Sequence, residues 1–212
     1  MTKYVILQCT NPECNFRFPS EIDNYGIYCP FCGERLLVHK YTLDNGYAQF
    51  GKKASLHLEC VLDNIRSSYN VGSILRSASA FSLKHIYLCG FTPTPAQLKV
   101  KKTSLGAEIS VPWSHSMNAL TLVQQKKQDG YRIYSIEASL TSNSLLNCSA
   151  NSLCDRVLIV LGNEIFGIDP EIRKISDAVL QIPITGEKKS LNVATAFSIT
   201  LFYFSLLFHK PV

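Results

Sequence analysis

From residue 55 onward, short apolar runs alternate with helical patterns, and this alternation constrains the fold more than any other feature of the sequence. In Arg156–Leu161 (RVLIVL), every residue after the arginine is apolar, so both faces of such a strand are apolar. Strands of this kind are typical of a parallel sheet that is covered on both sides. The alternation therefore predicts an α/β domain over residues 55–212, with a mostly parallel sheet and helices on both faces.

The same pattern locates the individual elements. We expect strands at about 56–62, 85–89, 108–112, 131–136, 156–161 and 178–182. We expect helices at about 70–82, 98–105, 116–128 and 170–175, and a terminal helix within 191–208. In parallel sheets, ligands bind beyond the carboxyl ends of the strands. A functional site is therefore expected in the loops that follow the strands.

The cysteines fall into two groups. Four of them lie near the N-terminus, as C-x4-C followed by C-x2-C, and these are Cys9, Cys14, Cys29 and Cys32. This spacing, with Gly33 after the last thiol, predicts a zinc ribbon in which all four thiolates bind a structural zinc ion. The remaining cysteines lie in mostly apolar contexts and are expected to be buried and inert.

We expect a zinc-ribbon-like segment over residues 1–40 and a linker over 41–54. A segment of about 40 residues cannot bury enough apolar surface to fold alone, so a metal or disulfides must stabilise it. Disulfides are typical of secreted chains, and the opening MTKYVILQC is too short and too polar for a secretory signal. Charges in this segment balance, and its aromatic rings, among them Tyr28 and Phe31, are expected to form its small core rather than a surface for RNA bases.

The most apolar stretch of the chain is Leu191–Phe208. Its length approaches the ~20 residues of a membrane-spanning helix, but polar residues such as Asn192 and Thr200 interrupt it. A buried or subunit-interface helix is therefore expected, without membrane insertion, in a cytoplasmic protein. The formal net charge of +5 permits an anionic partner without requiring one.

Three polar segments follow predicted strands. In the first, Asn64–Arg76, Asn70 is expected to cap the next helix, Gly72 to open the surface, and Arg76 to lie about two turns into the helix. Such a helix start beside an arginine favours phosphate. The second is Leu161–Ile168 (LGNEIFGI), whose glycines are expected to let the backbone approach a ligand.

The third segment is Ile182–Ala194 (IPITGEKKSLNVA), whose exposed amides and carbonyls suit an adenine or methionine moiety better than a pyrophosphate. Neither a Gly-x-Gly-x-x-Gly fingerprint nor a Gly-Lys-Ser/Thr phosphate loop occurs in the chain, so a nicotinamide cofactor is not expected.

In this order, the three segments resemble the signature motifs of the SpoU (TrmH-like) family of SPOUT-class RNA methyltransferases. The motifs are Asn-x5-Arg, Gly-Asn-Glu-x2-Gly and Ile-Pro-x2-Gly-x3-Ser-Leu-Asn-Val-Ala, and the intervening segment 102–108 is also similar. The resemblance covers about residues 56–208, and the cysteine segment lies outside it. Thr185 and Ala194-Thr195 depart from the family pattern without removing a polar motif residue.

The resemblance implies a C-terminal trefoil knot that binds S-adenosylmethionine, and a homodimer with active sites at the interface. Five residues fall on the family's catalytic positions, namely Asn70, Arg76, Glu164, Ser190 and Asn192. Four fall on its cofactor contacts, namely Leu161, Gly162, Ile182 and Leu191. The implied reaction is methyl transfer from S-adenosylmethionine to a ribose 2′-hydroxyl of RNA, with tRNA slightly preferred over rRNA.

Two alternatives stay open, which are a non-catalytic RNA-binding or ribosome-assembly module and a base methyltransferase of the same class. The family proposal makes the arginine the proton acceptor, but a guanidinium resists deprotonation in proteins. We therefore expect Arg76 to hold a phosphate and to stabilise the developing alkoxide. Glu164 and Asn192 are expected to orient Arg76, and Ser190 to line the pocket.

Overall fold

The computed structural model describes residues 4–21, 23, 26–40, 57–149 and 155–208. The chain divides into two compact units, residues 1–50 and 51–212. The expected linker at 41–54 lies outside the described residues, as does Cys154.

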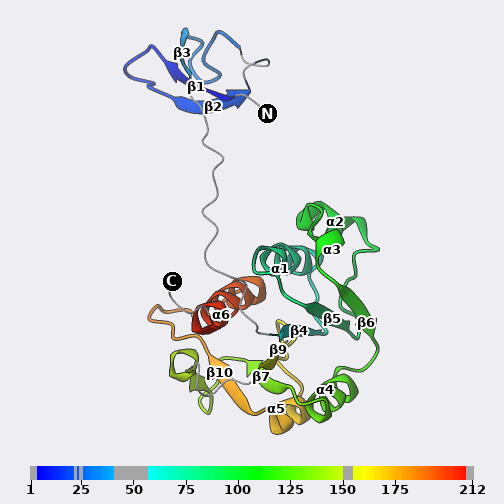
Figure 1. Ribbon diagram of the computed structural model, residues 1–212. Coiled ribbons are helices and arrows are strands. Elements are labelled where there is room, and N and C mark those ends of the chain that lie inside the picture. Colours follow the sequence, from blue (N-terminus) through cyan, green and yellow to red (C-terminus); the bar gives the residue numbers. More distant parts are fainter. Residues whose placement is uncertain (1–3, 22, 24–25, 41–56, 150–154, 209–212) are drawn as a thin grey trace. The chain divides into compact units, whose positions relative to one another are not determined.

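The first unit is a three-stranded antiparallel sheet in the order β2-β1-β3 (Figure 1). Its strands are β1 (Tyr4–Cys9), β2 (Arg17–Glu21) and β3 (Leu36–Lys40). Alternate residues of β1 point inward, and Val5 and Leu7 are each 1% exposed. The expectation of an aromatic core is wrong for Tyr28 and Phe31, which are 56% and 76% exposed, because β1 and the thiols fill the interior.

The second unit contains a seven-stranded sheet in the order β6-β5-β4-β9-β7-β10-β8. The strands are β4 (His57–Asp63), β5 (His85–Cys89), β6 (Trp113–Ser116), β7 (Arg132–Ile136), β8 (Asn143–Ser144), β9 (Arg156–Leu161) and β10 (Ala178–Gln181). All neighbouring strands are parallel, which confirms the predicted sheet.

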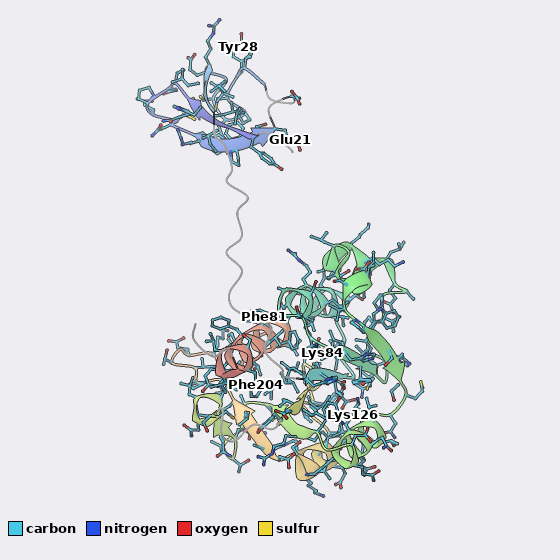
Figure 2. All side chains as sticks on the ribbon, viewed as in Figure 1. Glu21, Tyr28, Phe81, Lys84, Lys126 and Phe204 are labelled. Carbon is cyan, nitrogen blue, oxygen red and sulfur yellow. The ribbon has the colours of Figure 1, made fainter. Side chains whose placement is uncertain are left out.

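Helices cover both faces of this sheet (Figure 1). They are α1 (Ser68–Ala80), α2 (Leu98–Ser104), α3 (Ala107–Ser110), α4 (Ala119–Gln128), α5 (Pro170–Ile175) and α6 (Val193–Phe208), with a 3-10 turn at Leu145–Asn147. One buried cluster joins α1 and α6 to the sheet, and a second joins α4 and α5 to it. Figure 2 shows Phe204 on α6 and Lys126 on α4 on opposite sides of the sheet, where Lys126 pairs with buried Glu59 at 2.6 Å.

The terminal helix α6 has one buried and one exposed side. Phe197, Leu201 and Phe204 are fully buried, whereas Phe202 and Leu206 are 51% and 52% exposed. The spacing of the buried residues follows the helical repeat, so one stripe packs on the sheet and another faces outward. Of the helices in the described part of the chain, none combines the length and apolar character needed to cross a membrane.

One predicted strand is wrong. Residues 108–112 were expected to be extended, but Ala107–Ser110 form α3 and the edge strand β6 begins only at Trp113. Gly106 turns the chain at a φ of 87°, and Ser110 bonds to Ser79 of α1 at 2.9 Å, which holds α3 against that helix. The alternation of polar and apolar residues in Glu108–Val111 fits a strand as well as a single helical turn, so it does not identify the element.

The strand order also bears on the expected knot. β7 and β8 follow one another in the chain, but in the sheet the later strand β10 lies between them. Tyr203 of α6, the helix that follows β10, donates hydrogen bonds to the carbonyls of Leu146 and Cys148 in the connection between β8 and β9. A C-terminal knot requires the last segment to lie among earlier connections in this way, and the threading itself stays a prediction.

Candidate functional site

Three loops meet at the carboxyl ends of β4, β9 and β10, as the parallel sheet predicts. They connect β4 to α1, β9 to α5 and β10 to α6. The last two line a pocket of about 700 Å³, together with the end of β7. The three polar segments that the sequence singled out begin at or in these loops, and the first continues into α1 as far as Arg76.

A chain of hydrogen bonds connects the three loops. Glu164 Oε2 accepts from the backbone N–H of Arg66 at 2.9 Å, and its Oε1 accepts from Ser67 N at 3.3 Å and from Asn70 Nδ2 at 2.9 Å. Asn192 Nδ2 then donates to Asn70 Oδ1 at 3.0 Å. Residues that are far apart in the sequence therefore form one polar network.

The network favours the ionised form of Glu164. Partial burial opposes ionisation, but the N–H of Arg66, the amide of Asn70 and the N–H of Ser67 donate to the carboxylate and hold the pKa of Glu164 below its ordinary value. A carboxylate that accepts three hydrogen bonds is charged at neutral pH and has a fixed orientation. In this chain it fixes the start of α1 against the loop after β9.

The loop after β9 is held from inside by Asn163, which is 7% exposed. Its Nδ2 donates to Asn64 O at 2.7 Å, and its Oδ1 accepts from the N–H of Ile165 and Phe166. A Cβ added at Gly162 would lie 2.3 Å from the Gly167 carbonyl oxygen, so glycine is needed where the loop closes on itself. Gly162 thus lets the two ends of the loop approach each other, and the approach of a ligand to this backbone stays a prediction.

Two expectations about the start of α1 are wrong. Ser67 caps the helix, and its side chain accepts from Asn70 N, so Asn70 lies inside the first turn with its amide free to reach Glu164 and Asn192. Gly72 is buried rather than open, because α2 packs there and an added Cβ would lie 2.5 Å from the Cβ of Thr103. Both expectations rest on the residue type alone, and the residue type does not show which neighbouring residues or helices pack there.

The pocket collects most of the residues that the motifs predicted. All four expected cofactor positions line it, and these are Leu161, Gly162, Ile182 and Leu191. Of the expected catalytic positions, Glu164, Ser190 and Asn192 line it as well, and Asn70 joins them through its hydrogen bonds.

Arg76 lies elsewhere. It is exposed and lines a separate hollow of about 490 Å³ with residues of α1, α2 and α3, among them Ser79 and Ser104. The expectation that Glu164 and Asn192 orient Arg76 is wrong for the single chain, because their hydrogen bonds go to Asn70 and to backbone N–H groups. On α1, Arg76 lies roughly one and a half to two turns beyond Asn70, the residue of that helix that Glu164 contacts.

Sequence reasoning missed Glu137, which follows β7 and lines the pocket. Its Oε2 accepts from Ile168 N at 2.7 Å, and its Oε1 pairs with Arg173 at 3.1 Å. A Cβ added at Gly167 would lie 2.7 Å from the same carboxylate, and Gly167 has a φ of 74°. Glu137 therefore holds the loop after β9 from its outer side, and only its position after a buried strand could have indicated this.

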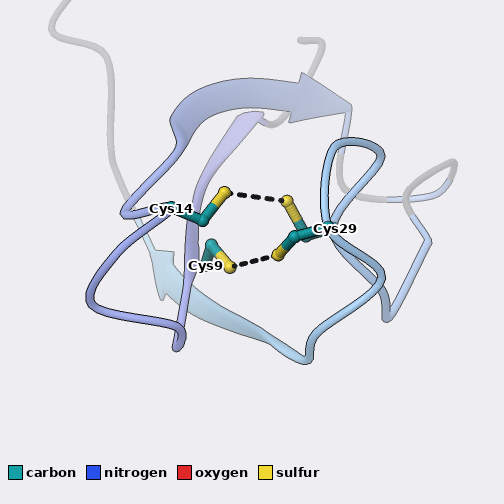
Figure 3. Close-up of side chains that lie close together, drawn as sticks. Cys9, Cys14 and Cys29 are labelled. Atoms are coloured by element: carbon teal, nitrogen blue, oxygen red, sulfur yellow. Dashed lines mark hydrogen bonds between the residues drawn. The ribbon is translucent and has the colours of Figure 1, made fainter.

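In the first unit, the four predicted thiols come together (Figure 3). Their sulfur atoms all lie within 4.8 Å of one another, with Cys9 and Cys32 at 3.4 Å and Cys14 and Cys29 at 3.8 Å. A tetrahedral zinc site with Zn–S bonds of about 2.3 Å separates its sulfurs by about 3.8 Å. The donor set and its spacing therefore fit a structural zinc ion.

The knuckle geometry also follows the prediction. Gly33 adopts a φ of 76°, in the left-handed region that favours glycine. Burial opposes ionisation of the Cys29 thiol, but the N–H groups of Cys32 and Phe31 donate to it and lower its pKa to about 7. Backbone amides that point at a sulfur in this way stabilise the thiolate form that a metal binds.

Comparison with known proteins places the second unit in a family. Residues 57–202 match the model of the SpoU rRNA Methylase family. The chain is 34% identical over 143 residues to the 23S rRNA (guanosine-2'-O-)-methyltransferase RlmB of Xylella fastidiosa, and the match covers 67% of this chain and 55% of that protein. The RlmB of Xanthomonas axonopodis pv. citri is 31% identical over 149 residues, or 68% of this chain and 57% of that one. The chain thus spans about half the length of these curated relatives.

Solved structures show the same fold. The TrmH/SpoU tRNA modifying enzyme of A. aeolicus superimposes with a TM-score of 0.65 at 24% identity, over 73% of this chain and 77% of that chain. The AdoMet-bound rRNA methyltransferase of Sinorhizobium meliloti gives 0.64 at 23% identity, over 81% of this chain and 64% of that one. Because the family model matches more than half of its residues, the chain belongs to the SpoU rRNA methylase family.

Proposed function

We propose that the protein transfers a methyl group from S-adenosylmethionine to a ribose 2′-hydroxyl of RNA. The observation that carries this proposal is the hydrogen-bond chain Glu164–Asn70–Asn192, which joins the three motif segments beside one pocket. A non-catalytic RNA-binding module needs no such combination of a fixed carboxylate and amides beside a pocket. The curated relatives are named for 2'-O-methylation of 23S rRNA, and the A. aeolicus neighbour is described as a tRNA modifying enzyme, so both RNA classes enter the test.

The pocket suits the cofactor. Its volume of about 700 Å³ falls in the range of small-molecule sites, and its wall is formed by backbone-rich loops after β7, β9 and β10. We assign the cofactor to Leu161, Gly162, Ile182 and Leu191, which lie in this wall. When bound, S-adenosylmethionine supplies an activated methyl group, so the protein acts mainly by positioning.

The hydrogen-bond network of Glu164, Asn70 and Asn192 is the part of the site that we expect to contact the RNA. We infer that Glu164 keeps Asn70 and Asn192 in one fixed arrangement, in which their amides orient the ribose hydroxyl. Ser190 lines the same pocket and offers a further hydroxyl. Groups that are already oriented before the reaction lower its barrier without reorganising during it.

We propose that Arg76 acts at the pocket of the partner subunit in a homodimer. Arg76 lies apart from the pocket of its own chain, and α6 presents an apolar stripe that includes Ile199, Phe202 and Leu206. Such a stripe suits a self-complementary interface. There Arg76 binds an RNA phosphate and stabilises the developing alkoxide, while its guanidinium keeps its proton. The proton of the hydroxyl passes to solvent water, and the bond between sulfur and the methyl group breaks as the oxygen–methyl bond forms.

Mixed dimers test this arrangement. Arg76→Ala and Asn192→Ala each inactivate the homodimer, but a mixture allowed to exchange subunits recovers about a quarter of wild-type activity, because half of the dimers have one intact site. Mixtures that stay inactive after verified exchange place both residues in the site of one chain and contradict the proposal.

The first unit completes the proposal as a structural zinc site on Cys9, Cys14, Cys29 and Cys32, in a protein that acts on RNA in the cytoplasm. The whole function is tested by calorimetry with S-adenosylmethionine and by methyl transfer to total RNA from a strain that lacks the gene. Cofactor binding with transfer to tRNA or rRNA is expected. Cofactor binding without any transfer identifies a binding module and overturns the proposal.

A further inference from the structure

Phe166 is 86% exposed at the tip of the loop after β9, beside the pocket that it helps to line. Ile165, the residue before it, is 64% exposed. Single exposed apolar side chains are common on protein surfaces and need no explanation. Phe166 differs because it projects from a loop that lines a pocket and contains Glu164.

The backbone that presents this ring is fixed. Asn163 Oδ1 accepts from Phe166 N at 3.1 Å and from Ile165 N at 2.9 Å, and Gly167 N donates to Asn163 O at 2.9 Å. A ring on a fixed backbone loses little conformational entropy when a partner packs on it. The loop therefore holds Phe166 ready for contact.

The segment that this loop reaches through its hydrogen bonds has side chains that fit RNA. Glu164, two residues before Phe166, accepts from the N–H of Arg66, whose side chain is exposed, and it also bonds to Asn70. Tyr69, next to Asn70 on α1, is 66% exposed. An exposed arginine pairs with phosphate, and exposed aromatic rings stack on unpaired bases.

We propose that Phe166 is a stacking surface for an unpaired RNA base beside the reacting ribose, with Tyr69 and Arg66 as the adjoining contacts. This inference rests on the proposed function and narrows its substrate to nucleotides in loops or single strands. Bases in a duplex are stacked on their neighbours and do not offer a free face to such a ring.

The test uses the full chain with saturating S-adenosylmethionine and two probes, a short single-stranded oligoadenylate and the same strand paired with oligouridylate. Phe166→Ala is compared with Phe166→Tyr, which keeps a ring. Met117→Ala is the matched control, because Met117 is 82% exposed but follows β6 at the edge of the sheet. Since both side chains are exposed, the three variants are expected to fold.

Phe166→Ala is expected to weaken binding of the single strand by roughly 5- to 150-fold, the range that one stacked base supplies. Phe166→Tyr and Met117→Ala bind it like the wild type, and the cofactor affinity of all variants is unchanged.

Four results overturn the inference. The first two are that Phe166→Ala binds the single strand as tightly as the wild type, or that it loses as much affinity for the duplex as for the single strand. The third is that Phe166→Ala loses affinity for S-adenosylmethionine, which makes the ring a cofactor contact. The fourth is that Phe166→Ala changes the mass of the assembly, which makes the ring a subunit contact. Failure of the proposed function is a separate outcome, because the wild type itself then transfers no methyl group to RNA.

Discussion

The two units bury very different interiors. Among the described residues of the first unit, the buried apolar side chains are Val5 and Leu7, together with the thiols of Cys9 and Cys29. In the second unit, two large apolar clusters cover the two faces of a seven-stranded sheet. Stability of the first unit is therefore expected to depend on the cysteine cluster, for which we propose a zinc ion. Stability of the second depends on apolar clusters to which the polar site residues Glu164, Ser190 and Asn192 do not belong.

This difference determines whether a mutation can remove the candidate site without unfolding the unit that contains it. In the first unit, replacing one of the four cysteines is expected to remove the fold, so site and structure fail together. In the second, Glu164, Ser190 and Asn192 are exposed side chains on loops above the core. Their replacement is expected to abolish the reaction while the sheet stays folded.

The largest expected effect is on the first unit. Cys29→Ser, or removal of zinc by a chelator, is expected to unfold it, because zinc binding contributes about 10–16 kcal/mol to small sites of this kind. In amide NMR spectra of the full chain, signals of residues 4–40 should collapse to random-coil positions while those of 57–208 persist. Cys148→Ser, which changes a thiol outside the cluster, should alter neither set. Dispersed signals from 4–40 in the zinc-free chain contradict this prediction.

The second-largest expected effect comes from a substitution in the buried core of the second unit. Phe197→Ala on α6 replaces a fully buried ring and should lower the free energy of unfolding by about 3–5 kcal/mol in urea titrations. Phe91→Ala removes a ring of the same size from a position that is 62% exposed and should cost much less. Zinc content should stay unchanged in both. Equal destabilisation by the two variants contradicts the burial that we describe.

A smaller effect concerns the loop after β9. Glu137→Ala leaves the N–H of Ile168 without its acceptor and Arg173 without its ion pair. The free energy that holds the loop in its conformation should fall by about 1–3 kcal/mol. Calorimetry should therefore show S-adenosylmethionine binding weakened by roughly tenfold. Glu171→Ala, at an exposed position in the first turn of α5, is the control. If Glu137→Ala binds S-adenosylmethionine as tightly as the wild type, Glu137 does not position the loop for the cofactor.

The smallest effect is on pH dependence. The pKa of Glu164 is lowered in the folded protein, so its hydrogen bonds stabilise the fold above the unfolded value of about 4.3 and lose that contribution as the pH falls through the folded pKa. The stability difference between wild type and Glu164→Gln should be present at neutral pH and vanish in acid. A difference that is the same at both pH values shows that the charge of Glu164 contributes nothing.

The sequence predicts the larger features of both units because each has a repeating or chemical signal. Alternating strands and helices specify the parallel sheet, and thiol spacing specifies the cysteine cluster. Contacts between distant segments have no such signal. For this reason the pattern predicts a strand in place of α3, a cap at Asn70 and an open surface at Gly72, whereas the neighbouring helices and Ser67 decide all three.

The candidate site shows the same limit. Order and spacing of the motifs bring Glu164, Asn70 and Asn192 to one network, and the structure adds the partners of each. The position of Arg76 could not be predicted, because residue spacing says where it lies on α1 but not which pocket that side of the helix faces. Glu137 lies outside every motif, so only the fold identifies its contact with the loop.

The central claim is most directly tested by digesting RNA methylated by the full chain and identifying the modified nucleoside by mass spectrometry. We predict a single 2′-O-methylated nucleoside that Asn192→Ala does not produce. A methyl group on a base, or wild-type yield from Asn192→Ala, contradicts the account.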